Sequence, residues 1–350
     1  MRLLYFNPEN DLALAANDPH YTPPASARQM AYDLREFPRL WTVKELIPKD
    51  STAPCSSLAL WKENDAEGVL PWGWSPLAVC QLRSAGVAES LLPSAVDLEA
   101  YRQFSSRQTA VLLLKKIRER WPSDFEAGYL TGESGWCRTE EDVRKMCEQY
   151  GATMLKMPWS GSGRGVRPVT AGGLNEKDVA WVRRTLTRQG GVEVEPIYNK
   201  VQDFAMEFWA EDRRVRYEGL SVFETTPGGV YAGNLVASEM QKVSRLAQYV
   251  DPSLLQAVRQ RLVILLNEAD VPAWYTGPLG IDMMIVENTP PSSIHRPRFS
   301  VHPLVEINLR MTMGWVALQL QQKLAEGEVG TFKIDHSNGQ YSALFIKNGI

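Results

Sequence analysis

Residues 156–166 read Lys-Met-Pro-Trp-Ser-Gly-Ser-Gly-Arg-Gly-Val, a glycine-rich segment led by a lysine. Small residues let backbone N–H groups come close to phosphate oxygens, and a neighbouring lysine or arginine supplies the countercharge. The segment lacks the GxxxxGK[ST] pattern of a P-loop, and no helix follows its glycines as a dinucleotide-binding turn requires. Because residues 167–170 read as a second strand, we predict a strand–loop–strand flap, although a solvent-exposed hairpin also fits the pattern.

A second polar pattern ends a later strand, at Glu306-Ile307-Asn308-Leu309-Arg310. Strand residues two apart face the same side, so Glu306, Asn308 and Arg310 are expected to project together. Asp282, on the preceding strand-like segment, would add a second carboxylate across the hairpin. Two carboxylates and an amide oxygen make an oxygen-only set suited to Mg²⁺, and the adjacent arginine would bind a phosphate or an acyl-phosphate. The exposed polar face of an edge strand is the alternative.

The rest of the chain alternates strand-like and helix-like segments. Strands are predicted at 2–6, 152–157, 192–195, 204–210, 214–223, 230–234, 280–287 and 301–308, with further candidates near 40–47, 58–61 and 91–93. Helices are predicted at 25–37, 76–85, 140–150, 175–190, 252–268 and 315–325. This order indicates a small α/β unit in the first hundred residues, followed by a larger region that mixes sheets and helices.

The composition is that of an ordinary globular chain of 350 residues, 44% hydrophobic and 23% charged. Its net charge of −3 gives no overall attraction to nucleic acid or acidic lipid. The four cysteines lack CxxC spacing and the four histidines are dispersed, which argues against zinc sites and disulfide frameworks. No segment approaches the roughly 20 apolar residues that span a bilayer. We therefore expect a cytoplasmic protein that binds neither nucleic acid nor membrane.

The glycine flap, followed some 150 residues later by the acid-Asn-Arg strand, resembles the ATP-grasp superfamily. This family includes biotin carboxylase, D-alanine–D-alanine ligase and glutathione synthetase, and the resemblance covers roughly residues 100–320. It implies an α/β and α+β fold in which two α+β subdomains clasp ATP, preceded by a small Rossmann-like α/β domain. On this division residues 1–100 form the N-terminal domain and residues 101–350 the ATP-grasp domain, with residues 150–195 as its glycine-flap subdomain.

The resemblance also assigns residues to ATP and metal. Asp282, Glu306 and Asn308 match the metal ligands for one or two Mg²⁺ ions, and Arg310 matches the arginine that follows them. The implied ATP-binding residues are Lys156, Ser160, Gly161, Ser162, Gly163, Arg164, Gly165 and Val166 of the flap, Glu195, Ile197 and Tyr198 of the adenine hinge, and Asp203 near the ribose. The family's further lysine, about 45 residues before the flap lysine, is missing. Arg107 stands near its place and would contact the α-phosphate, keeping the charge and adding a fork.

Members of this family activate a carboxylate by attack on the γ-phosphate of ATP, and an amine-type nucleophile then displaces the acyl-phosphate. The resemblance therefore implies an ATP- and Mg²⁺-dependent carboxylate–amine ligase, with Arg310 and Lys156 as catalytic cations and small-molecule or peptide substrates. The alternatives are an ATP-grasp phosphotransferase and a non-catalytic nucleotide-binding regulatory protein. The intact metal-ligand set speaks against the second alternative. No motif indicates the identity of the substrates or the oligomeric state.

Two shorter motifs are candidates for the acceptor pocket and for an interaction surface. Asn7–Asp11 follows the first strand, where an open α/β sheet places its ligands, although an ordinary capped loop fits as well. The Trp72-Gly73-Trp74 segment fits either an interaction patch or buried structural aromatics.

Overall fold

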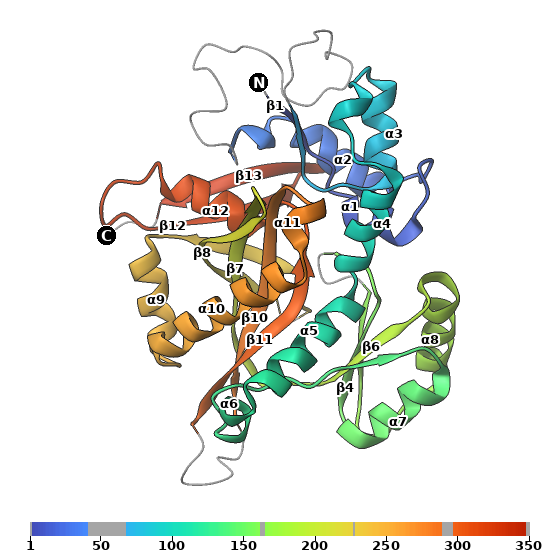
Figure 1. Cartoon of the computed structure of the whole chain (residues 1–350), viewed down its shortest axis with the longest axis vertical. Helices are drawn as coiled ribbons and strands as arrows, with labels where there is room; N and C mark the ends of the chain where they lie inside the picture. Colours follow the sequence, from blue (N-terminus) through green and yellow to red (C-terminus); the bar gives the residue numbers. More distant parts are fainter. Residues whose placement is uncertain (1, 41–67, 162–164, 227, 289–296, 348–350) are drawn as a thin grey trace.

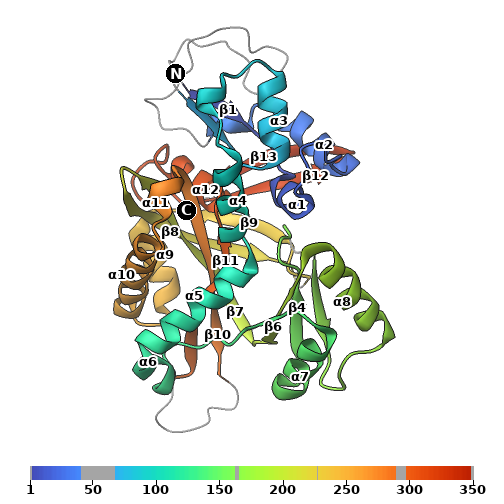
Figure 2. The same ribbon diagram turned by 45° about the vertical axis from the view of Figure 1, so that its right-hand side comes forward.

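The computed structural model describes residues 2–40, 68–161, 165–226, 228–288 and 297–347. Within these ranges the strands form three sheets of two, four and seven strands. In Figures 1 and 2 the unit with the two-stranded sheet lies at the top, and the four-stranded sheet lies beside the lower part of the seven-stranded sheet. No helix in the described ranges combines the length and the apolar character needed to cross a membrane.

The N-terminal unit is built on a parallel pair of short strands, β1 (Arg2–Tyr5) and β2 (Gly68–Pro71). Its helices are α1 (Asn10–Ala16), α2 (Ala25–Asp33), α3 (Pro76–Ser84) and α4 (Ala95–Phe104), with 3₁₀ turns at Phe37–Leu40 and Glu89–Leu91. Parallel pairing with interleaved helices confirms the predicted α/β unit. Helix α4 continues past residue 100, and its Tyr101 and Phe104 join the core of the large sheet.

The predicted strand at 91–93 is wrong. Leu91 ends a 3₁₀ turn, and Ser94 opens α4 with a capping box that Asp97 completes, so these residues connect two helical elements. Leu40 likewise ends a 3₁₀ turn, while the remainder of the predicted strand at 40–47 and the whole of 58–61 lie outside the described residues.

The four-stranded sheet with its two helices is called the flap subdomain below. It comprises β3 (Gly135–Cys137), α7 (Glu140–Tyr150), β4 (Thr153–Lys156), β5 (Val166–Val169), α8 (Glu176–Gln189) and β6 (Val192–Pro196), in the strand order β3-β6-β4-β5. Thr139 and Asn175 cap the two helices in complete capping boxes. Strands β4 and β5 are antiparallel with Lys156 opposite Val166, which confirms the strand–loop–strand flap.

The seven-stranded sheet has the order β11-β10-β7-β8-β9-β12-β13. Its strands are β7 (Lys200–Glu211), β8 (Arg214–Thr225), β9 (Tyr231–Val236), β10 (Gly277–Glu287), β11 (Phe299–Asn308), β12 (Gly330–Ser337) and β13 (Gln340–Lys347). The helices around it are α5 (Arg107–Arg120), α6 (Pro122–Glu126), α9 (Glu239–Ala247), α10 (Pro252–Glu268), α11 (Val271–Trp274) and α12 (Met313–Gln321).

The two faces of the large sheet pack against different helices. Phe208 is fully buried in the core that α5, α9 and α10 cover, whereas the next residue, Trp209, points to the other face and contacts Trp315 of α12. Helix α5 contacts β11 of the large sheet and β3 and β6 of the flap subdomain, and Figure 1 shows it next to both. The amino-terminal end of α5, the end of β11 and the flap therefore come together.

Candidate functional site

The amino-terminal end of α5 is hydrogen-bonded to the flap. Ser106 caps the helix by accepting a hydrogen bond from the backbone N–H of Gln108. The backbone N–H of Arg107 donates to the carbonyl of Pro158, just beyond β4, at 3.1 Å. This places the side chain of Arg107 between the flap subdomain and the end of β11.

Buried charges fill this junction. The ammonium of Lys156 lies 2.6 Å from a Glu195 carboxylate oxygen, and the guanidinium of Arg107 lies 2.8 Å from Glu306. Between the two cations stands Glu193, with one oxygen 3.9 Å from each of them. The side chains of Arg107, Lys156 and Glu193 are only 6%, 5% and 3% exposed. Because desolvating isolated charges is costly, such a cluster is held by its mutual attraction.

The pKa values reflect this crowding. Burial raises the pKa of Glu193 to about 7, which Lys156 opposes and Glu195 reinforces. Burial lowers the pKa of Arg107, but the carboxylates of Glu306 and Glu193 outweigh it, and the net shift is upward. Three carboxylates and two cations thus meet at the junction, and both cations are held in place before any ligand arrives.

The predicted metal ligands lie together at the end of the β10–β11 hairpin. Asp282 is the direct register partner of Glu306, and the amide nitrogen of Asn308 donates to Asp282 at 3.1 Å. Desolvation and the neighbouring Glu306 raise the pKa of Asp282 to about 7. Two facing carboxylates and an amide, all able to offer oxygen, fit a hard divalent cation that would relieve this repulsion. No cluster of three His, Cys, Asp or Glu side chains with metal-binding geometry occurs in the described part of the chain.

Arg310 lies beside this set and pairs with an acid from the N-terminal unit. Its Nε and Nη2 each donate to one carboxylate oxygen of Asp11, both at 2.8 Å. A narrow cleft opens here, lined by residues 10–11 of the N-terminal unit, Ser105, residues 159–160 of the flap and residues 306–310 of β11 and its end.

The flap residues differ in how much of them is described. Ser160 is buried, and its hydroxyl has no hydrogen-bond partner among the residues with described positions. Gly161 approaches the N-terminal unit so closely that a Cβ there would lie 2.7 Å from an Asp11 oxygen. Gly165 has a φ of +78°, a conformation that favours glycine. Ser162, Gly163 and Arg164 lie outside the described residues.

The structure separates the predicted hinge residues. Glu195 joins the charge cluster through Lys156, whereas the side chain of Ile197 is 46% exposed and its backbone N–H donates to Ala152. The Tyr198 hydroxyl accepts a hydrogen bond from the backbone N–H of Glu133 at 2.7 Å. Asp203 lies on β7 and accepts from the Thr225 hydroxyl at 2.7 Å.

Three residues around this site were not identified from the sequence, and the contact of a fourth, Asp11 of the Asn7–Asp11 motif, was not anticipated. Glu193 stands two residues before Glu195, and strand periodicity could have placed both on one face. His302 is buried against the Tyr198 ring, and neither ring nitrogen has a partner within the described ranges. Glu207 is buried on β7, and Asp11 reaches the site from far along the chain. No sequence signal marks these last three contacts.

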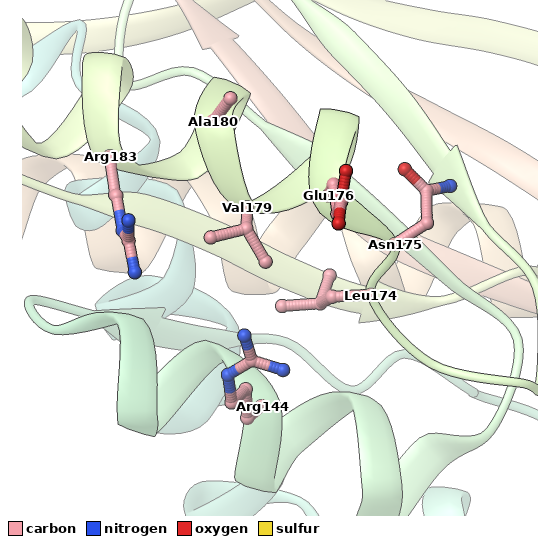
Figure 3. A pocket seen from close by; sticks show the side chains of 7 residues that line it. All are labelled: Arg144, Leu174, Asn175, Glu176, Val179, Ala180 and Arg183. Atoms are coloured by element: carbon pink, nitrogen blue, oxygen red, sulfur yellow. The ribbon is translucent and has the colours of Figure 1, made fainter.

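A second hollow, of about 360 Å³, lies between the two helices of the flap subdomain. Figure 3 shows Arg144 and Arg183 approaching it from the two sides. Both arginines are 2.7 Å from oxygens of the single carboxylate of Glu140, and their side chains are 40% and 70% exposed, so solvent screens their charges. The chemistry is concentrated instead at the junction of the flap, α5 and β11.

No protein-family model matches the chain, and no curated protein matches it. Among similar solved structures is N5-carboxyaminoimidazole synthetase from Staphylococcus aureus complexed with ADP, at 11% identity and a TM-score of 0.44, covering 78% of this chain and 67% of that chain. The biotin carboxylase domain of 2-oxoglutarate carboxylase from Hydrogenobacter thermophilus, with MgADP, ADP and bicarbonate, has 12% identity and a TM-score of 0.49, covering 78% of this chain and 59% of that chain. D-alanyl-alanine synthetase A from Vibrio cholerae has 14% identity and a TM-score of 0.42, covering 75% of this chain and 73% of that chain.

The chain spans 59% of the length of the biotin carboxylase chain. All three are ATP-grasp enzymes, the superfamily that the sequence resembles. The mixed architecture of sheets and helices expected from the sequence is confirmed by the elements described above.

Proposed function

We propose that this chain is an ATP- and Mg²⁺-dependent ligase of the ATP-grasp type, which joins a carboxylate to an amine-type nucleophile through an acyl-phosphate. One observation carries the proposal. Two buried cations, Arg107 and Lys156, stand near the facing carboxylates of Asp282 and Glu306, and Lys156 ends the first strand of the flap. Transfer of a phosphoryl group demands this combination of fixed positive charge and hard-cation ligands.

Lys156 and Arg107 would neutralise phosphate charge. In the described arrangement their charges are balanced by Glu195, Glu193 and Glu306, so a triphosphate would compete with these carboxylates for the two cations. Asp282, Glu306 and Asn308 would hold Mg²⁺, which when bound supplies further positive charge to the phosphates. Glu306 would then leave Arg107, and Arg107 would be available to phosphate.

The flap and Arg310 would act on the later stages of the reaction. Residues 160–166 would cover the triphosphate and exclude water, which protects an acyl-phosphate from hydrolysis. Arg310 would stabilise the acyl-phosphate or its carboxylate precursor. Glu195 and Tyr198 would border the adenine and Asp203 the ribose, whereas the exposed side chain of Ile197 leaves that residue at most a backbone role. We expect small-molecule or peptide substrates and a cytoplasmic location.

The test is a screen of carboxylates and amines for substrate-dependent release of ADP, followed by analysis of the products. A ligase yields ADP, inorganic phosphate and a new amide. A product that retains the phosphate would indicate a phosphotransferase instead of a ligase.

A further inference from the structure

The guanidinium of Arg310 keeps one edge free of protein contacts among the described residues. Arginine carries five N–H donors. Nε and Nη2 each give one to Asp11, and Nη1 gives one to the carbonyl of Met311 at 3.0 Å. One donor therefore remains on each terminal nitrogen. A pair of this kind can bind two oxygens of one anion.

Asp11 lies in the first turn of α1, and the loop that precedes this helix is held firmly. The Asn7 amide donates to the carbonyl of Gly73 at 2.8 Å and accepts from its N–H at 3.2 Å. The carbonyl of Trp72 in turn accepts from the N–H of Met311 at 2.7 Å. The Asn7–Asp11 segment, which includes the start of α1, and the Trp72–Trp74 segment thus lie together beyond the carboxyl ends of the parallel strands β1 and β2. An open α/β sheet places its ligands at this end.

The surroundings of the pair point to an anion in the cleft. Arg310 lines it together with two acids, Asp11 and Glu306, which are paired with Arg310 and Arg107 respectively. The buried Ser160 also lines the cleft and has a hydroxyl with no partner in the described part of the chain. Gly161 of the flap packs directly on the Asp11 carboxylate. Asp11 is therefore in contact both with the flap and with the arginine.

We propose that Asp11 offsets the charge of Arg310 and so weakens its hold on anions, and that the remaining donors of Arg310 bind the phosphoryl oxyanion in this cleft. This inference rests on the proposed function. A guanidinium balanced by a fixed carboxylate holds an anion by directed hydrogen bonds more than by net charge. Such a site orients the transferred group and still releases inorganic phosphate.

The test titrates inorganic phosphate at saturating MgADP and constant ionic strength and follows the midpoint of thermal unfolding. Asp11→Asn keeps the side-chain shape and removes one negative charge next to Arg310. We expect phosphate to bind this variant roughly tenfold more tightly than the native chain or better, because one repelling charge a few ångströms away is removed. The shift caused by MgADP alone should stay unchanged.

Asp124→Asn is the matched control. Asp124 pairs with Arg261 between α6 and α10, and the side chains of this pair are 24% and 18% exposed, against 22% and 16% for Asp11 and Arg310. The control should lose a similar amount of stability and leave the phosphate affinity at the native value. Arg310→Lys supplies a second variant, for use if Asp11→Asn does not fold. This variant keeps the positive charge but loses the paired N–H donors of the guanidinium. The shift of the unfolding midpoint caused by phosphate should therefore disappear, while the shift caused by MgADP remains.

An Asp11→Asn phosphate affinity equal to or weaker than native would overturn the inference. A native chain that responds to MgADP but not to phosphate would overturn it too, as would a phosphate shift that survives in Arg310→Lys. A native chain that does not respond to MgADP at all would instead overturn the proposed function.

Discussion

The guanidinium of Arg107, at the first turn of α5, lies 2.8 Å from the carboxylate of Glu306 near the end of β11. The pair connects the residue proposed to replace the family's lysine with a predicted metal ligand. Only 6% of the Arg107 side chain is exposed to solvent, and 24% of the Glu306 side chain is exposed. The phosphate-binding and metal-binding parts of the candidate site are thus one electrostatic unit.

Replacing Arg107 with methionine should therefore damage both binding and folding. Breaking a buried ion pair by removing one partner typically costs about 3–5 kcal/mol, because the other charge is left uncompensated. We expect the free energy of unfolding, measured with urea, to fall by that amount. The folded fraction should also bind ATP at least tenfold more weakly. Native-like ATP binding by a destabilised variant would leave Arg107 with a structural role alone.

Lys156 is buried in its ion pair with Glu195, so Lys156→Ala should also lose about 3 kcal/mol of stability. The double variant Lys156→Gln/Glu195→Gln removes both charges and leaves two amides that can hydrogen-bond. We expect it to recover most of the stability but not the ATP binding, in a double-mutant cycle measured by unfolding and by nucleotide titration. Recovery of ATP binding in the double variant would remove Lys156 from the phosphate site.

Glu207 should make stability depend on pH. Desolvation, opposed by a hydrogen bond from Thr312, raises its pKa to about 8. An acid whose pKa is raised on folding contributes stability that is present below its unfolded pKa, about 4.5, and is lost as the pH rises towards 8. We expect Glu207→Gln to be increasingly more stable than the native chain between pH 5 and pH 8.5. Urea unfolding at both pH values measures this, and a constant difference would contradict it.

His302 carries two buried ring nitrogens that have no partner in the described ranges. Burial, with Lys156 nearby, lowers its pKa to about 3, so the ring is neutral at physiological pH. An unsatisfied buried polar group costs about 1–3 kcal/mol, so His302→Leu should raise the free energy of unfolding of the unliganded protein by about 1 kcal/mol. A lower stability would indicate that the ring nitrogens are hydrogen-bonded in solution, for example to a buried water.

The parts of the site that could be predicted depend on short-range rules. The flap follows from glycines between two strand-like segments, and the approach of Asp282 to Asn308 follows from the two-residue period of a strand. Helix starts at Thr139 and Asn175 follow from capping chemistry.

The remaining features depend on how separate units pack. Nothing near Asp11 in the sequence indicates that it meets Arg310, because the contact joins the first turn of α1 to the residues that follow β11. Strands β12 and β13 were not predicted, since most of their residues are half-buried or exposed and their hydrophobic alternation is weak. Helices α4 and α5 were also not predicted, although Ser94 and Ser106 cap them.

The central claim is that Glu306 belongs to a Mg²⁺–ATP site, and thermal unfolding with and without ATP and Mg²⁺ tests it most directly. A ligand at about 100 times its dissociation constant stabilises the folded state by roughly 2.7 kcal/mol, a readily measured shift. We predict a shift for the native chain that requires Mg²⁺ and fades in Glu306→Gln, with Glu268→Gln, which loses a surface ion pair to Arg120, behaving as native. No shift of the native chain at millimolar ATP, or an equal shift in Glu306→Gln, would contradict the claim.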